Sequence, residues 1–142
     1  MPSRRKSREL ALQMLFQWEV GQHTPGKVIA TFLPAHKADD EVKEFARLLF
    51  EGTVAEIGSI DPLVRRHAEN WKLERMAAVD RNVLRLAVYE LLHHPETPPA
   101  VVINEALELA RRFSTPDSVE FANGVLDAVR KSLALPAASA EE

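Results

Sequence analysis

The chain has 142 residues, of which 46% are hydrophobic, and its 18 basic and 21 acidic side chains give a net charge of -3. This length suits a single globular domain with enough apolar residues for a core. The absence of cysteine excludes disulfide scaffolds, thiolate metal sites and thiol nucleophiles. No apolar run approaches the roughly 20 residues of a membrane span, so we expect a cytoplasmic protein without membrane contact.

The charge is distributed unevenly, because four of the first eight residues are cationic: Arg4, Arg5, Lys6 and Arg8. The other 14 basic and 21 acidic residues give a balance of -7. Cations at a helix N-terminus oppose the macrodipole, so helix stability does not explain the cluster. It is interpreted either as a solvated basic leader or as an arm, residues 1–8, that binds an anionic partner such as nucleic acid.

The first half of the chain predicts four helices from the spacing of its apolar residues. They are expected at residues 9–19, 28–33, 39–57 and 61–67. Gly21, Pro34 and Gly58 end the first three segments. Asp61 and Pro62 are typical of an N-cap followed by the first residue of a helix, and so open the fourth.

The second half predicts three longer helices, at residues 76–93, 101–113 and 116–133. The first is apolar around most of its circumference and is expected at the centre of the domain. Val101 begins a β-branched run, but apolar spacing continues to Phe113 and favours a helix. The whole predicts an all-α, single-domain bundle of about seven helices over residues 1–134, followed by a disordered tail at 135–142.

Several polar or small residues interrupt these helices. Arg85 has no acid four residues away, so its partner is expected on another helix or in solvent, with Asn104 and Glu105 as candidates. Most such groups should cross-link the bundle, whereas Asp80, near the exposed start of its helix, is free for another role. Gly124 lies inside a helix and predicts a close helix crossing.

No arrangement of catalytic residues is evident. No histidine lies in a HExxH pattern or four residues from another, which argues against a metal site. The five glycines are scattered, no G-x-S-x-G occurs, and the Glu105 and Glu108 pair lacks a matched base. We therefore expect a protein without enzymatic activity, metal or cofactor.

Taken together and in order, several motifs of this chain resemble the NusB family. They lie at residues 11–13, 17–18, 79–91, 103–106 and 121–127. The resemblance implies an all-helical fold of two packed three-helix subdomains without catalytic activity. It also implies binding to boxA-type single-stranded RNA of ribosomal RNA leader transcripts together with the ribosomal protein NusE. Through NusE and other antitermination factors, such a protein acts indirectly on RNA polymerase.

The resemblance also implies which residues form the two sites. RNA contacts are expected at Arg4, Arg5, Lys6, Arg8, Phe16, Asp117, Ser118 and Phe121. A NusE contact is expected at Asp80. Two positions depart from the family pattern: Lys6 stands where arginine is common and lacks its bidentate fork, and Phe16 stands where tyrosine is frequent and lacks its hydroxyl. Phe121 lies beside the buried stripe of its helix, where an aromatic ring can stack on an unpaired base.

Two other functions are compatible with the residues alone. One is a helical protein-interaction module that does not bind RNA. The other is an accessory domain like the one that precedes the catalytic domain of some ribosomal RNA cytosine methyltransferases, although 142 residues leave no room for that catalytic domain. Exposed apolar surface would also allow a homodimer, and the sequence does not decide between monomer and dimer.

Overall fold

The computed structural model describes residues 3–69 and 71–135, and within these ranges all regular structure is helical. The α-helices are α1 (Arg4–Val20), α2 (Pro25–Phe32), α3 (Asp40–Ala55), α4 (Ile57–His67), α5 (Ala78–His93), α6 (Pro99–Phe113) and α7 (Pro116–Ser132). Two 3-10 turns, η1 (Leu33–Ala35) and η2 (Leu73–Arg75), precede α3 and α5. The predicted all-α fold of about seven helices is confirmed. No helix of the described part is both long and apolar enough to cross a membrane.

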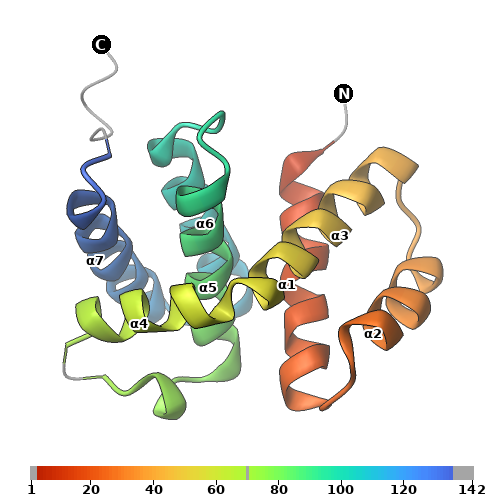
Figure 1. Ribbon diagram of the computed structural model, residues 1–142, viewed down its shortest axis with the longest axis horizontal. Coiled ribbons are helices and arrows are strands. Elements are labelled where there is room, and N and C mark those ends of the chain that lie inside the picture. The colour runs from red at the N-terminus through yellow and green to blue at the C-terminus, as the bar shows by residue number, and fades with distance from the viewer. Residues whose placement is uncertain (1–2, 70, 136–142) are drawn as a thin grey trace.

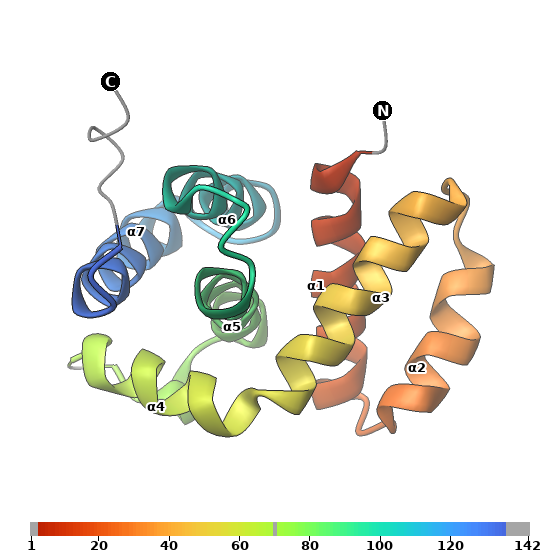
Figure 2. The same ribbon diagram turned by 45° about the horizontal axis from the view of Figure 1, so that its top comes forward.

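The helices form two groups that meet where α1 packs against α5 (Figure 1 and Figure 2). α1, α2 and α3 pack together in one group, and α4, α5, α6 and α7 form the other. The second group has four helices where the resemblance implied three, because α4 packs against α5 and α7. The domain is therefore two subdomains joined through α3–α4 and through the contact of α1 with α5.

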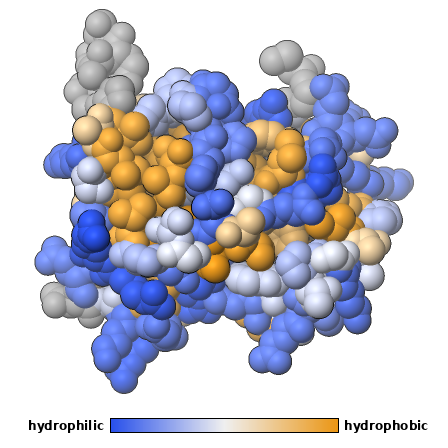
Figure 3. Space-filling model, in the orientation of Figure 1, coloured by the Kyte–Doolittle hydropathy of each residue, from blue (hydrophilic) through white to orange (hydrophobic). Residues whose placement is uncertain are grey.

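The core is mainly aliphatic and has α5 at its centre. α5 packs against α1, α3, α4, α6 and α7, as its nearly continuous apolar surface predicts. Leu10, Phe50, Leu84 and Leu126 are completely buried and come from four different helices. Burial of each such side chain contributes about 1.5–3 kcal/mol to folding. Figure 3 shows apolar residues gathered between α6 and α7 and again between α1 and α3, with polar residues separating the two areas.

The basic cluster forms the first two turns of α1 rather than an arm ahead of it. α1 begins at Arg4, five residues before the predicted start at Glu9. The Ser3 hydroxyl caps the helix by accepting a hydrogen bond from the Lys6 backbone N–H at 3.1 Å. Arginine and lysine are good helix formers, so a capped helix tolerates them here despite the dipole. Residues 1–2 of the predicted arm lie outside the described residues.

The predicted helix start at Asp61 and Pro62 is wrong, because α4 begins at Ile57 and contains both residues. The break between α3 and α4 is at Glu56, whose backbone (φ -102°, ψ 16°) leaves the helical region. Pro62 is the sixth of the 11 residues of α4, where its missing N–H costs one backbone hydrogen bond inside the helix. The Asp61 carboxylate does not cap α4, since it accepts two hydrogen bonds from Arg85 at 2.9 Å.

The close helix crossing occurs at Gly52 and not at Gly124. A Cβ atom at Gly52 would lie 2.1 Å from the Tyr89 hydroxyl oxygen, so glycine is what allows α3 to approach α5. At Gly124 a Cβ atom would meet nothing within 4 Å. The crossing predicted at Gly124 is therefore wrong, and that glycine lies on the exposed side of α7.

The C-terminal boundary lies close to the predicted one. α7 ends at Ser132, and Leu135 still packs against the core while its carbonyl accepts a hydrogen bond from Arg130 at 3.1 Å. Leu135 therefore belongs to the folded domain. The rest of the predicted tail, residues 136–142, lies outside the described residues.

A set of ion pairs, which we call the polar seam, joins α1 to α5. It consists of Arg8, Glu19, Asp61, Arg81, Arg85 and Glu90. Glu19 of α1 accepts hydrogen bonds from both Arg81 and Arg85, and Arg85 also binds Asp61 of α4. Asn104 and Glu105 are therefore not the partners of Arg85. Burial raises the pKa of Glu19, but the hydrogen bonds from Arg81 and Arg85 outweigh it and leave the pKa below its ordinary value.

Candidate nucleic-acid interface

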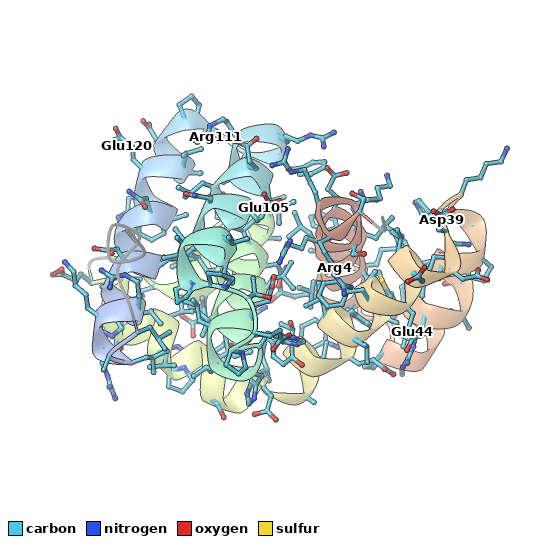
Figure 4. The ribbon with its side chains drawn as sticks, turned by 90° about the horizontal axis from the view of Figure 1, so that it is seen from above. Arg4, Asp39, Glu44, Glu105, Arg111 and Glu120 are labelled. Atoms are coloured by element: carbon cyan, nitrogen blue, oxygen red, sulfur yellow. The ribbon has the colours of Figure 1, made fainter. Side chains whose placement is uncertain are left out.

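The four cations at the start of α1 point in different directions because successive residues of a helix are rotated by about 100°. Arg4 lies over the ring of Phe45 in α3, 3.7 Å from its centroid. Arg5 faces α6 and donates two hydrogen bonds to the Glu105 carboxylate, at 3.0 and 2.9 Å. Figure 4 shows Arg4 at the end of α1 and Glu105 on the neighbouring α6. The cluster is therefore spread between the two subdomains.

Arg8 does not belong to the exposed cluster, which corrects its expected role as an RNA contact. Its side chain is only 5% exposed and donates to both carboxylate oxygens of Glu90, at 2.7 and 2.8 Å. A guanidinium held in this bidentate way inside the protein is not available to a phosphate. Arg8 instead ties the start of α1 to α5.

Two arginines of α6 extend the basic surface beyond α1. Arg112 forms an ion pair with Glu9 of α1, and the Lys6 ammonium lies 3.9 Å from the same residue. Arg111, one residue earlier, pairs with Glu108. We call the exposed cations Arg5, Lys6, Arg111 and Arg112 the basic rim. Cations in the last turn of a helix are favoured by the dipole, so the sequence alone does not mark the two α6 arginines as binding residues.

The carboxylates of the rim keep these cations in place. The hydrogen bonds from Arg5 hold the pKa of Glu105 below its ordinary value, so Glu105 is ionised at neutral pH. Because the Arg5 side chain remains about half exposed, its pairing is solvent-screened and reversible. A phosphate can take the place of such a carboxylate without loss of a buried interaction.

The turn between α6 and α7 brings together residues expected in separate sites. The Asp80 carboxylate at the start of α5 accepts hydrogen bonds from the hydroxyls of Ser114 at 2.6 Å and Ser118 at 2.9 Å. Thr115 caps α7 by accepting a hydrogen bond from the Ser118 backbone N–H at 3.1 Å, and Pro116 follows as the first residue of the helix. Asp80, the expected NusE contact, and Ser118, an expected RNA contact, are thus hydrogen-bonded to each other.

Phe121 lies one turn further along α7. Its ring contacts Trp71, which lies in the loop between α4 and α5. Its ring centroid is 5.7 Å from that of Trp71, with the planes at 59°. Phe121 is half-buried, whereas Trp71 is 60% exposed. Asp117, at the first turn of α7, is exposed on the same helix. An exposed tryptophan is the signal that would have marked this loop as a binding element.

Phe16 lies apart from the other expected RNA residues. It follows Arg5 by eleven residues, roughly 16 Å along α1. Its ring is 42% exposed and borders a small apolar hollow together with Val79 and Phe113. Val79 is next to Asp80, so Phe16 shares the surface expected for the protein partner. The structure does not bring Phe16 to the basic rim.

No group of three or more acidic or histidine side chains in residues 3–69 and 71–135 is arranged to hold a metal ion. The residues of the candidate interface carry cations, hydroxyls, carboxylates and aromatic rings. Figure 4 shows Glu105, Arg111 and Glu120 in succession along α6 and into α7. Glu120 is the residue immediately before Phe121 in α7.

Comparison with known proteins places this arrangement in a family. A family model described as the NusB family matches residues 5–131. The transcription antitermination protein NusB of Koribacter versatilis is 54% identical over 92% of this chain and 90% of its own length. The corresponding protein of Solibacter usitatus is 46% identical over 96% and 94%.

Solved structures agree with the sequence relatives. A structure of T. maritima NusB superimposes with a TM-score of 0.82 at 38% identity, covering 92% of this chain and 93% of that one. A crystal structure of the antitermination factors NusB and NusE in complex with double-stranded RNA gives a TM-score of 0.83 at 27% identity, covering 91% and 96%. The identity and coverage of these relatives, together with the family model, show that the chain belongs to the NusB family.

Proposed function

We propose that this chain binds boxA-type single-stranded RNA of ribosomal RNA leader transcripts together with a NusE-type ribosomal protein. Its curated relatives are named transcription antitermination proteins, and membership of their family assigns it a non-catalytic role in that process. The related complex of NusB, NusE and RNA supports both partners. An accessory role in RNA methylation is not favoured, because the relatives match over nearly their whole length as antitermination proteins.

One observation carries the RNA part of this proposal: the basic rim leads directly to the turn between α6 and α7. Arg5, Lys6 and Arg112 supply phosphate contacts, which are sequence-independent and fix the position of the strand. Arg4 flanks them on the α3 side. Asp117, Ser118 and Phe121 supply the hydrogen-bonding and stacking groups that distinguish bases. Charge and specificity therefore come from two adjoining parts of one surface.

The protein partner is proposed to bind beside Asp80, where Phe16, Val79 and Phe113 expose apolar rings and methyl groups. An apolar centre with a charged residue at its edge is typical of a protein interface. Phe16 fits this surface better than an RNA contact, because it has no hydroxyl to donate and lies away from the basic rim. The hydrogen bond from the Ser118 hydroxyl to the Asp80 carboxylate makes the proposed partner surface and the proposed RNA surface contiguous.

RNA polymerase and other antitermination factors are proposed to be reached indirectly, through the bound RNA and the ribosomal protein. Such an assembly forms in the cytoplasm, where transcripts are made. A homodimer through Phe16, Val79 and Phe113 would occupy the surface assigned to the protein partner. Sedimentation of the chain with and without that partner distinguishes these states, since a dimer should dissociate when the partner binds.

The test of the proposed function is RNA affinity as a function of salt, with the ribosomal partner present. For single-stranded RNA the logarithm of affinity falls with a slope of about 0.7 per phosphate contact. Changing Arg4, Arg5 and Lys6 to alanine should weaken binding and reduce this slope by about 2. Arg8 is left unchanged because its removal would disturb the fold.

Lys27 and Lys37 provide a matched control, since both are exposed cations on or near α2 and neither is part of the rim. Their alanine variants should bind RNA like the unmodified chain, with the same salt slope. If the Arg4, Arg5 and Lys6 variant keeps the full affinity and slope, RNA binding by this surface is excluded and the chain is a protein-interaction module.

A further inference from the structure

A surface hollow that the sequence did not indicate lies between the end of α4 and the middle of α7. Its volume is about 380 Å³, within the range of small-ligand sites. Its lining includes His67, Glu69, Trp71, Glu120, Phe121 and Gly124. We call it the α4–α7 hollow.

Gly124 lines the α4–α7 hollow and contributes no side chain to it. It lies inside α7, where glycine destabilises a helix relative to alanine. A Cβ atom at this position would meet nothing within 4 Å, so no packing contact within the described part of the chain requires glycine. A group that approaches α7 from outside would benefit from the missing side chain.

Two aromatic rings border the hollow on one side. Trp71 and Phe121 contact each other at 5.7 Å, and the indole of Trp71 is 60% exposed. A tilted pair with one ring so exposed leaves an aromatic face free. Such a face stacks on any unpaired base, because every base has a π-surface of its own.

The polar groups of the hollow suit the edge of a base better than a phosphate. Glu69 and Glu120 place carboxylates on its lining, and these accept hydrogen bonds from exocyclic amino groups but repel phosphate oxygens. The His67 Nε2 atom is buried and has no hydrogen-bond partner among the described residues.

We propose that the α4–α7 hollow receives one unpaired, amino-bearing base of the bound RNA, which lies over Gly124 and stacks on the Trp71 and Phe121 pair. The inference rests on the proposed RNA-binding function and extends its base-reading surface beyond Phe121. Ser118 lies one turn before Phe121, so the hollow continues the path that begins at the basic rim. Adenine, cytosine and guanine carry an amino group for the carboxylates, and uracil does not.

The sharpest test is to fill the hollow without harming the fold. Gly124→Leu should raise the melting temperature, because it replaces glycine in a helix and the added atoms start in open space. It should nevertheless weaken binding of boxA-type single-stranded RNA by about tenfold, the size of one lost stacking contact. Gly58→Leu is the matched control: Gly58 also lies in a helix with open space at its Cβ and does not line the hollow. That variant should keep full affinity.

A scan of the RNA identifies the base. Replacing each base in turn by an abasic unit should show one position that weakens binding to the unmodified chain about tenfold but not to Gly124→Leu, since the contact is already lost there. Uracil at that position should also weaken binding. Purely additive losses at every position would overturn the inference.

Tryptophan fluorescence tests the same contact independently. The chain has two tryptophans, so Trp18→Phe leaves Trp71 as the reporter. RNA should quench its emission, and Gly124→Leu in the same background should abolish the quenching. An unmodified chain that does not bind the RNA overturns both this inference and the proposed function. RNA binding that is salt-dependent but equal in Gly124→Leu and Gly58→Leu overturns the hollow alone.

Discussion

The polar seam and the basic rim use the same pair of chemical groups, arginine and carboxylate, in two different environments. In the seam, the side chains of Arg8 and Glu90 are 5% and 2% exposed. In the rim, Arg5 and Arg112 are each 54% exposed, while their partners Glu105 and Glu9 are 18% and 8% exposed. Arg5 and Arg8 are only three residues apart, yet one faces solvent and the other the interior.

Exposure decides what each pair can do. Removing one partner of a buried pair leaves an uncompensated charge and costs about 3–5 kcal/mol. An exposed pair contributes about 0–1 kcal/mol, because water screens it. The seam is therefore structural, whereas Arg5 of the rim can leave its carboxylate for a phosphate at little cost in stability. The positive charge counted in the sequence is thus larger than the charge available to RNA.

The largest expected effect is the loss of stability when an ion pair of the polar seam is broken. Arg8→Met keeps most of the side-chain volume but leaves the Glu90 carboxylate buried and unpaired, so the free energy of unfolding should fall by about 3–5 kcal/mol. Urea denaturation monitored by circular dichroism measures this change. Combining it with Glu90→Leu should recover most of the stability, because a buried pair replaced by apolar groups of similar size is often neutral. A single Arg8→Met variant as stable as the unmodified chain would show that Arg8 is exposed in solution.

The next effect concerns Glu19, which holds both Arg81 and Arg85. Glu19→Gln should lower the free energy of unfolding at neutral pH by about 2 kcal/mol, because charge-assisted hydrogen bonds are lost. The pKa of Glu19 is lowered in the folded state, so its stabilisation is complete above the ordinary value of 4.5 and is lost as the pH falls through the folded pKa. The difference between the two proteins should therefore shrink below pH 4.5. A difference that stays constant from pH 7 to pH 3 would contradict this assignment.

The contrast between seam and rim also shows which features a sequence can reveal. The central place of α5 follows from its nearly continuous apolar surface, and the start of α7 follows from Thr115 and Pro116, since both signals are local. Burial of Arg8 was not predictable, because its partner Glu90 lies 82 residues away in the chain. The role of Gly52 was missed for the same reason, since only the packing of α3 on α5 brings Tyr89 to it.

The candidate site was predictable to a similar degree. Resemblance to the family placed Ser118 and Phe121 on α7, where the structure has them at the turn and beside Trp71. It gave no reason to select Arg112 or Trp71, which join the surface only through contacts between α1 and α6 and between the α4–α5 loop and α7. Helix periodicity assigns a side to each residue, but the neighbour on that side depends on the tertiary fold.

In the rim, Arg112→Ala should lower stability modestly and weaken RNA binding. The loss of one phosphate contact should reduce affinity several-fold and the salt slope by about 0.7. The free energy of unfolding should fall by about 1–2 kcal/mol, because the Glu9 carboxylate is only 8% exposed and keeps only the Lys6 ammonium, 3.9 Å away, as a partner. Lys37→Ala is the control for a cation outside the rim. Equal RNA affinity of both variants would remove Arg112 from the interface.

The smallest expected effect is a gain in RNA affinity rather than a loss. Glu105→Gln removes the carboxylate that competes with phosphate for Arg5, so RNA affinity should rise, by about twofold, and the salt slope should not fall. Stability should change by less than about 1 kcal/mol, since Arg5 is half exposed. Parallel titrations of RNA at two salt concentrations measure this gain. Weaker binding by Glu105→Gln would mean that Glu105 orients Arg5 toward the RNA, and the ion pairs of the rim would then be part of the binding geometry rather than competitors of the phosphate.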